Sequence, residues 1–523
     1  MKLNLGFVVF YILFSAYNCL SYECYSLDYT CNPQSLLINS SSLNEDNVNH
    51  SNPGETFSNS GTRQWTRLLG VAGAFTTAYG ITSDSLGNVY TTGMTSGNLD
   101  GQALSGTQDL FVTKYDGNGN KQWTRLLGVA GIQTSARGIT SDNLGNVYTT
   151  GTTFGNLDGQ ALSGTQDLFV TKYDGSGNKQ WTRLLGVAGA TTQANGISRD
   201  IFNNLHVSGY TLGNLDGQAL SGIQDLFVTK YDTGGNKQWT RLLGVAGQIT
   251  QANGVAFDSS GNIYLTGRTS GNLDGQALSG IQDLFVTKYD TGGNKQWTRL
   301  LGVAGQITTT AYGITSDSLG NVYTTGVTSG NLDGQALSGT QDLFVTKYDT
   351  GGNKQWTRLL GVAGVSTTAY GITSDSLGNV YTTGVTSGNL DGQALSGTQD
   401  LFVTKYDTGG NRQWTRLLGV AGQITQANGI ASDSSGNTYL TGRTSGSLDG
   451  QALSGTQDLF VTKYDSGGNK QWTRLLGIAG VSTTAYGITS DSLGDLYSTG
   501  ITSGNLDGQI LTGTQDLFVL KYR

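Results

Sequence analysis

Eight tryptophans divide most of the chain into units of nearly constant length. Consecutive tryptophans are 58 residues apart, except for one interval of 59, and each stands in the string Gln-Trp-Thr-Arg-Leu-Leu-Gly. A fixed period without drift indicates one supersecondary unit that is used eight times. The tryptophans are Trp65, Trp123, Trp181, Trp239, Trp297, Trp356, Trp414 and Trp472.

Each unit contains four short segments with the composition of β-strands. In the first complete unit they are residues 77–84, 88–95, 109–115 and 121–128. The first two and the last two segments are joined by an Asp-x-x-Gly-Asn string, which predicts a short hairpin turn with glycine at a positive φ. No helical period follows residue 70. The unit is therefore expected to be a four-stranded antiparallel sheet.

The strands predict sheets that are covered on both faces. In the segment 109–115, Leu110 and Val112 lie on one face, and Phe111 and Tyr115 lie on the other. A sheet with one wet face would alternate more cleanly, so sheets stacked face to face around an axis fit better. Four-stranded sheets arranged in this way form a β-propeller.

The two ends of the repeat region predict a closed ring. The region opens with a single outer strand, 63–70, and ends at Arg523 after three strands of the last unit. The opening strand can complete the last sheet, which leaves no exposed sheet edge. The expected fold class is all-β: a single eight-bladed β-propeller over 63–523, with four antiparallel strands per blade and the N-terminal strand in the last blade.

The repeat resembles a known family. The motif comprises the string Asp-Leu-Phe-Val-Thr-Lys-Tyr-Asp at 109–116, Gly119-Asn120 and Trp123, and the Gly-Ile to Val-Tyr-x-x-Gly stretch at 138–151. It is similar to the SBBP beta-propeller repeat. The resemblance recurs over 63–523 and implies a secreted or surface propeller of bacteria. It implies no shared chemistry.

The first eighteen residues have the pattern of an export signal. Lys2 is followed by an apolar stretch over 3–14, which is too short to span a bilayer as a helix. Cys19 follows, with Ala16 and Asn18 at the −3 and −1 positions, so the site resembles a spirochaete-type lipoprotein site. Residues 1–18 are expected to be a signal peptide and Cys19 to be lipidated. Ordinary secretory cleavage near Ser21 and an uncleaved anchor are the alternatives.

The segment 19–62 is expected to be a disordered tether. It contains both prolines of the chain and is rich in Asn and Ser, a composition that buries little apolar surface. After lipidation of Cys19, Cys24 and Cys31 remain as an even pair for a disulfide in an oxidising compartment. The alternative is that both stay free thiols.

Charge excludes a nucleic-acid function. The formal net charge is −7, and charged residues are 13% of the chain. A nucleic-acid binder needs a basic face to neutralise phosphates, and the sequence supplies none.

Differences among the units concentrate at two positions, which the strand order brings to one end of the ring. The first holds Tyr79, Arg137, Asn195, Asn253, Tyr312, Tyr370, Asn428 and Tyr486. The second holds Met94, Thr152, Tyr210, Arg268, Val327, Val385, Arg443 and Ile501. The first set, together with Tyr210, Arg268 and Arg443, predicts a polar binding site for a protein or a glycan at one mouth of the channel. Neutral variation of loop residues is the alternative.

Other repeated residues have structural interpretations. The arginine of each Trp-Thr-Arg string is expected to pair with a nearby Asp, and the tryptophans are expected to pack between blades. The loop around Asp100 has two of the three ligands that a calcium motif needs before its glycine, so an Asp-Gly turn is favoured over a calcium site. His206 replaces a strand tyrosine and is interpreted as a packing variant.

Catalysis is not expected, because eight near-copies offer no residue pair unique to one blade that could serve as acid and base or as a metal cage. We therefore expect no cofactor and no metal site. The leading function is an exported, lipid-anchored interaction protein, similar to an adhesin, with a monomer favoured. A periplasm-facing scaffold for envelope assembly is the first alternative, and a quinoprotein-like enzyme is a weaker one.

Overall fold

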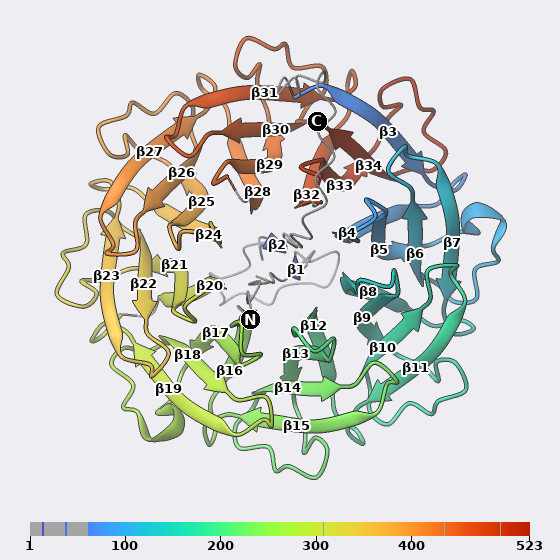
Figure 1. The fold of residues 1–523 in the computed structure, drawn as a ribbon, viewed down its shortest axis with the longest axis horizontal. Helices are drawn as coiled ribbons and strands as arrows, with labels where there is room; N and C mark the ends of the chain where they lie inside the picture. Colours follow the sequence, from blue (N-terminus) through green and yellow to red (C-terminus); the bar gives the residue numbers. More distant parts are fainter. Residues whose placement is uncertain (1–12, 15–36, 39–60, 307, 434, 492) are drawn as a thin grey trace, which may run out of the picture.

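The computed structural model describes residues 13–14, 37–38, 61–306, 308–433, 435–491 and 493–523. Eight sheets, each built on four blade strands and two of them extended by one short extra strand, stand around a central axis and form a closed ring (Figure 1). This arrangement confirms the eight-bladed β-propeller. Cys19, Cys24 and Cys31 lie outside the described residues, as do most of the predicted signal peptide and tether.

In blades 1 to 7 the strands run outward in chain order, and in blade 8 the first strand of the ring, β3, is outermost. We call the four strands of a blade the inner, second, third and outer strands. The inner strands are β4 (Thr76–Ser83), β8 (Thr134–Ser141), β12 (Thr192–Arg199), β16 (Thr250–Phe257), β20 (Thr309–Ser316), β24 (Thr367–Ser374), β28 (Thr425–Ser432) and β32 (Thr483–Ser490). The second strands are β5 (Val89–Thr95), β9 (Val147–Thr153), β13 (Leu205–Thr211), β17 (Ile263–Thr269), β21 (Val322–Thr328), β25 (Val380–Thr386), β29 (Thr438–Thr444) and β33 (Leu496–Thr502).

The third strands are β6 (Asp109–Tyr115), β10 (Asp167–Tyr173), β14 (Asp225–Tyr231), β18 (Asp283–Tyr289), β22 (Asp342–Tyr348), β26 (Asp400–Tyr406), β30 (Asp458–Tyr464) and β34 (Asp516–Tyr522). The outer strands of blades 1 to 8 are β7 (Lys121–Leu127), β11 (Lys179–Leu185), β15 (Lys237–Leu243), β19 (Lys295–Leu301), β23 (Lys354–Leu360), β27 (Arg412–Leu418), β31 (Lys470–Leu476) and β3 (Arg63–Leu69). Two 3-10 turns, η1 (Leu99–Gly101) and η2 (Leu273–Gly275), lie in long loops between second and third strands.

Two short strands precede the ring. β1 (Leu13–Phe14) pairs antiparallel with β12, and β2 (Leu37–Ile38) pairs parallel with β28. In the part of the chain that the structure describes, no helix has the length and apolar character needed to cross a membrane.

The ring closes as the sequence predicts. β3 pairs antiparallel with β34, and the backbone of Thr62 exchanges two hydrogen bonds of 2.9 and 3.0 Å with Arg523. Asp495 stands where most units have Asn, and it accepts hydrogen bonds of 2.6 and 2.8 Å from Arg523. Lys521 also lies 2.7 Å from this carboxylate. The closing blade therefore replaces an ordinary turn contact with an ion-paired cluster.

The hairpin turns of the blades, two in each of blades 1 to 7 and one in blade 8, lie on one face of the ring, which we call the turn face. There each blade is bound to the next through backbone carbonyls. Trp123 Nε1 and Lys114 Nζ donate to the carbonyl oxygen of Gly175, at 3.1 and 3.0 Å. Arg125 Nε donates to the carbonyl oxygen of Gly177 at 2.6 Å. The expectation that these arginines pair with Asp is wrong, because the guanidinium donates to main-chain oxygens, those of Gly177 and Ser176 in the neighbouring turn and that of Thr124 in its own strand.

Glycine is required in that turn for two reasons. Gly177 has a φ of +81°, and a Cβ at this position would lie 2.6 Å from the ring of Trp123. The positive φ disfavours any side chain, and the tryptophan occupies the space that a side chain would need. The same pair recurs as Gly119 against Trp65. Near-identity of the turns follows from this packing.

The other hairpin turn is held by a buried aspartate. Asp84 accepts hydrogen bonds from the amides of Leu86 and Asn88, both at 2.9 Å, and from the hydroxyl of Tyr90 at 2.9 Å. The Tyr90 hydroxyl also lies 3.2 Å from the carbonyl oxygen of Gly145 in the next blade. One aspartate therefore orders its own turn and orients the residue that contacts the neighbour.

The long loop between second and third strands covers the exposed edge of the outer strand. The side-chain amide of Gln102 donates to the carbonyl oxygen of Thr124 and accepts from the amide of Leu126 at 3.1 Å. Asp100 in the same loop has a φ of +54° and forms an ion pair with Lys121. The glutamine protects the edge from pairing with another chain, and the aspartate has a cationic partner within its own blade.

Candidate functional site

The variable mouth is the end of the channel where inner strands begin and second strands end. All eleven predicted ligand-binding side chains are buried or half-buried; the first variable position is the fourth of the eight residues of each inner strand, and the second is the sixth of the seven residues of each second strand. The first variable position is a β-bulge in every inner strand: Ala78 pairs with Gly93 and Gly80 with Thr92, which leaves Tyr79 as the extra residue. A Cβ on Gly93 would lie 1.8 Å from the carbonyl oxygen of Thr77, so the glycine opposite the bulge is obligatory. Bulges re-aim side chains, and this one presents the variable residue.

Asparagine at the bulge binds the next blade. Asn253 Nδ2 donates to the carbonyl oxygen of Ala311 at 2.8 Å, and Asn428 Nδ2 donates to that of Ala485 at the same distance. Asn195 makes the equivalent bond at 3.3 Å. These amides therefore have a structural role between neighbouring inner strands, which sequence reasoning did not anticipate.

The two predicted arginines are held by glutamines of their own blades. Arg268 contacts Gln251 Oε1 through Nη2 at 3.1 Å and Gln282 Oε1 through Nη1 at 3.4 Å. Gln282 in turn donates to the hydroxyl of Thr310 in the next blade at 2.6 Å.

The same arrangement recurs in blade 7. Arg443 lies 3.3 Å from Gln426 Oε1 and 3.3 Å from Gln457 Oε1. In blade 3 the Tyr210 hydroxyl donates to Gln193 Oε1 at 3.0 Å. In each of these blades a glutamine of the inner strand fixes the polar side chain of the second strand.

Sequence reasoning missed these glutamines, although the chain carries a signal for them. Blades 3, 4 and 7 read Thr-Gln-Ala-Asn-Gly at the start of the inner strand, whereas blades 1, 5, 6 and 8 read Thr-Thr-Ala-Tyr-Gly. The register pairs the second residue of this string with the second variable position. Glutamine faces Tyr or Arg, and threonine faces Met, Val or Ile. Two blade types therefore exist, an Asn type and a Tyr type, and blade 2, with Arg137, belongs to neither.

The tyrosines form an apolar sector of the mouth. Tyr79 and Tyr370 are buried, and the rings of Tyr312 and Tyr370 lie 6.0 Å apart at an interplanar angle of 54°. Burial raises the pKa of the Tyr312 hydroxyl, and the nearby guanidinium of Arg268 acts in the opposite direction. The junction of blades 4 and 5 therefore places a cation beside a tyrosine pair.

His206 lies near the turn face rather than at the variable mouth. Its Nε2 is 3.1 Å from Asp200 Oδ2, and Lys230 Nζ is 3.4 Å from the same oxygen. The histidine ring packs against Phe257, with centroids 4.9 Å apart. Burial lowers the pKa of His206 despite the aspartate. Burial also opposes ionisation of Asp200, but the hydrogen bonds from His206 and Asn204 outweigh it and bring the pKa of Asp200 to about 2.

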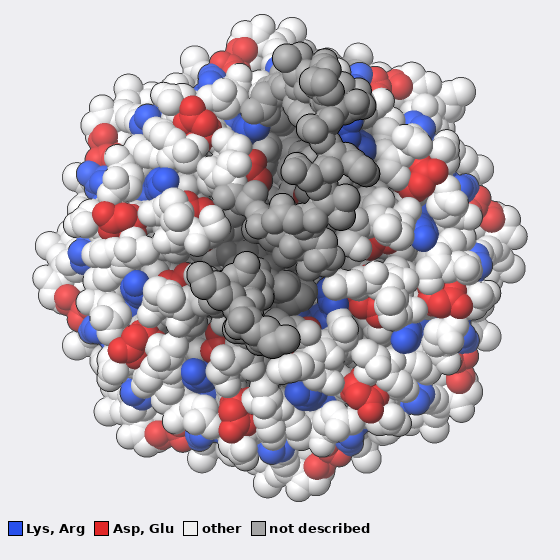
Figure 2. Space-filling view, viewed as in Figure 1, with Lys and Arg blue, Asp and Glu red and all other residues white. Residues whose placement is uncertain are grey.

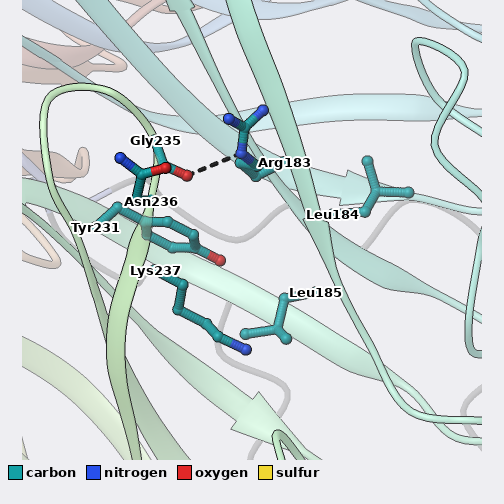
Figure 3. A pocket seen from close by; sticks show the side chains of 7 residues that line it. All are labelled: Arg183, Leu184, Leu185, Tyr231, Gly235, Asn236 and Lys237. Atoms are coloured by element: carbon teal, nitrogen blue, oxygen red, sulfur yellow. Dashed lines mark hydrogen bonds between the residues drawn. The ribbon is translucent and has the colours of Figure 1, made fainter.

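Among the described residues, no group of three or more His, Cys, Asp or Glu side chains is placed to hold a metal ion. A cleft of about 370 Å³ lies on the outer wall between blades 2 and 3, away from the variable mouth. Figure 3 shows Arg183 over this cleft, with Nε donating to the carbonyl oxygen of Gly235 at 2.8 Å. Its lining consists of repeated residues, so the cleft carries no blade-specific chemistry. The lining residues are Arg183, Leu184, Leu185, Tyr231, Gly235, Asn236 and Lys237.

The face of the ring shown in Figure 2 has a mixed surface charge. Figure 2 shows acidic and basic side chains interspersed around the face in view, with neither sign gathered into a patch among the coloured residues. Such a surface gives no support to binding of a polyanion.

The chain belongs to the SBBP beta-propeller repeat family. The family repeat matches eight segments that together make up more than half of the chain, at residues 64–100, 122–158, 180–216, 238–274, 296–333, 355–391, 413–449 and 471–507. Each match runs from an outer strand through the following inner and second strands, so it includes the variable mouth.

Two curated relatives are similar over long stretches. The regulatory protein FlaEY of Caulobacter vibrioides is 28% identical over 408 residues, which is 67% of this chain and 40% of that protein. An uncharacterized WD repeat-containing protein, L264, of Acanthamoeba polyphaga mimivirus is 26% identical over 333 residues, 47% of this chain and 24% of that protein. The chain spans less than half the length of these relatives.

Solved structures with this architecture are remote in sequence. The Dos1 propeller is 11% identical with a TM-score of 0.43 and covers 87% of this chain and 95% of its own. The RRP9 WD40 repeats are 10% identical with a TM-score of 0.40 and cover 75% and 95%. The family match and the sheet topology identify the chain as a β-propeller repeat protein, a fold that commonly serves as an interaction module.

Proposed function

We propose that the ring is an interaction module that binds a protein or a glycan at the variable mouth. The observation that carries this proposal is the location of the differences among blades. The units are nearly identical on the turn face, where contacts between blades dictate the residues, and they diverge where inner strands begin.

The chemistry of the mouth suits a polar ligand with an apolar part. The Asn-type blades offer amide and guanidinium groups, and the Tyr-type blades offer aromatic faces with hydroxyls. In blade 7, Gln426 is 3% exposed, and its Nε2 has no hydrogen-bond partner among the described residues. A buried donor without a partner is costly, and a bound ligand would satisfy it.

The proposed location is the cell surface. In this proposal residues 1–18 direct export, Cys19 carries the lipid, and the segment up to residue 62 tethers the ring, which acts as an adhesin without catalytic activity. Several similar blades would add avidity for a repeated ligand. The alternative is the same module facing the periplasm as an envelope scaffold.

Protease shaving of intact cells separates the two locations. An epitope tag between residues 32 and 62 is cut wherever protease reaches it. Loss of the tag while a periplasmic control protein survives supports the surface location. Cleavage only after the outer membrane is breached contradicts the adhesin and leaves the scaffold.

Binding is tested on printed arrays of glycans and matrix proteins. The variant Arg268→Val with Arg443→Val adopts side chains that Tyr-type blades already carry at these positions, so the ring is expected to fold. The matched control, Lys295→Ala with Lys470→Ala, removes two cations of the same blades at the outer edge, where they form ion pairs with Asp274 and Asp449. We expect array signals of the native chain to fall about tenfold in the arginine variant and to persist in the control. Equal signals in both variants would contradict the proposed site.

A further inference from the structure

The tips of the inner hairpin turns carry an exposed apolar ring. The third residue of this turn is Leu or Phe in six blades, with exposures between 61% for Phe202 and 84% for Leu144. Single exposed leucines are ordinary, but these six stand at equivalent places on one face of the ring, and apolar side chains that gather on one face mark interaction sites. The members of this apolar ring are Leu86, Leu144, Phe202, Leu319, Leu377 and Leu493.

Two of these side chains reach over the following turn. Leu493 Cδ1 of blade 8 lies 3.9 Å from the place where a Cβ on Gly87 of blade 1 would stand. Phe202 of blade 3 lies in the same way over Gly261 of blade 4, with Cε2 at 3.3 Å. Each of these side chains therefore covers the glycine of the following turn. Blades 4 and 7 interrupt the ring, because they carry Ser260 and Ser435.

The polar groups beneath the apolar ring are already satisfied. The carboxylate of Asp84 is buried and accepts four hydrogen bonds from its own blade. A partner that covers the turn would therefore leave no buried charge without a hydrogen bond. Such an unpaired charge is the usual obstacle to burying a polar turn. The outer hairpin turns place solvated carboxylates such as Asp116 around the apolar ring. An apolar centre within a polar rim is the anatomy of a protein interface.

We propose that this apolar ring is the interface of a face-to-face dimer of the chain. At ~150 Å² for a fully exposed side chain of this size, the six side chains expose about 700 Å². A stable interface buries about 800 Å² on each partner, and the polar rim supplies the remainder. A second copy of the chain carries an apolar ring of the same radius. In a two-fold symmetric dimer the apolar rings of the two copies pack against each other.

The two serines select one arrangement. A two-fold axis that sets Ser260 of blade 4 opposite Ser435 of blade 7 fixes every other pair of blades. The apolar pairs are then Leu319 with Leu377, Leu86 with Leu144, and Phe202 with Leu493. Each apolar side chain then faces an apolar side chain, and the serines face each other. This dimer departs from the monomer expected from the sequence.

Sedimentation velocity of the full chain over a wide range of concentrations tests the dimer. The variant Leu319→Ser with Leu377→Ser introduces the residue that blades 4 and 7 carry at this place. The matched control, Ile223→Thr with Ile281→Thr, removes two exposed apolar side chains from the opposite face, where other blades have Thr. We expect the native chain and the control to dimerise alike, and the dissociation constant of the leucine variant to rise at least about tenfold. A native chain that sediments as a monomer at every concentration overturns the proposal.

A mutant cycle tests the predicted register. Leu319 and Leu377 face each other across the axis, so the effects of the two single Ser variants on dimerisation should be strongly non-additive. Leu319 and Leu493 lie in separate contacts, so their effects should add. Additivity in both pairs would contradict the register.

A membrane is the competing occupant, because the described chain enters blade 8 on the same face at Thr62. Flotation with phosphatidylcholine vesicles tests it. Leucine-dependent flotation of a chain that stays monomeric would overturn the dimer, whereas equal flotation of the native chain and the Ser variant supports it.

Discussion

The two faces of the ring are built from the same eight units and differ in how freely their residues vary. On the turn face, Trp123 and Arg125 bind carbonyls of the next blade, and Gly177 leaves room for the tryptophan. At the variable mouth, contacts between blades are made by side chains that differ from unit to unit, such as Asn253. On the turn face the same set of contacts joins each blade to the next, whereas at the mouth the contacts between blades differ from one blade type to another. Variation is therefore tolerated at the mouth and is available for recognition.

The largest expected effect comes from alanine at a turn-face glycine. Gly177→Ala adds a strained positive φ and a clash with Trp123, so we expect it to lower the free energy of unfolding by ~3 kcal/mol or more. Gly189→Ala, in the loop before β12, keeps the positive φ of +69° but has no atom within 4 Å of the added Cβ. We expect it to cost only ~1 kcal/mol. Urea unfolding measures the loss in unfolding free energy of the two variants. Equal losses would show that packing against the tryptophan is not the reason why the turn residues are nearly identical in all blades.

Blade 3 allows a pH test of the turn face. His206 has a lowered pKa in the folded ring, so unfolding takes up a proton as the pH falls below about 6.5. Stability from this group is therefore complete at neutral pH and is lost on acidification. Asp200, with a pKa of about 2, keeps its stabilising charge until about pH 4 and loses it between pH 4 and 2.

His206→Tyr restores the residue of the other blades. We expect it to remove ~1 kcal/mol of the loss in unfolding free energy between pH 7 and 5. Urea unfolding at both pH values measures this. An unchanged pH dependence would show that the histidine does not titrate on unfolding.

At the mouth the expected effect of a deletion is smaller. Asn253→Ala removes one bond to Ala311 between inner strands, so we expect a loss of ~1 kcal/mol in unfolding free energy. Asn428→Ala, which removes the equivalent 2.8 Å bond to Ala485, serves as the comparison and should lose a similar amount. A loss as large as that of Gly177→Ala would erase the difference between the faces.

The smallest expected effect comes from replacing the pair of facing residues of an Asn-type blade by the pair of a Tyr-type blade. Gln251→Thr with Arg268→Val gives blade 4 the pair found in blade 5. Because Thr and Val already face each other there, we expect the double variant to change unfolding by less than ~0.5 kcal/mol, whereas Gln251→Thr alone should cost more. Thermal unfolding of the single and double variants measures this coupling, and simple additivity would contradict paired blade types.

Much of the fold follows from the sequence. The period predicts the number of blades, the strand pattern predicts four strands per blade, and the incomplete units at the two ends predict how the ring closes. The hydrogen-bond partners of Arg125 in the next blade could not be predicted from the sequence. They are main-chain oxygens about fifty residues further along the chain, and no side chain marks them. The bulge at Tyr79 is also invisible until a register exists. The glutamines that hold Arg268 and Arg443 were within reach, because Gln and Asn change together in the same units. The apolar ring was overlooked because each unit contributes only one leucine.

The most direct test of the mouth as a recognition surface converts its Asn-type blades 4 and 7 to the Tyr type. The variant carries Gln251→Thr, Asn253→Tyr and Arg268→Val, with the equivalent changes at Gln426, Asn428 and Arg443. Its binding to the glycan and matrix-protein arrays is compared with that of the native chain. We predict that the native signals are lost while the melting temperature stays within a few degrees of the native value. Retained signals from a folded, converted ring would contradict the account.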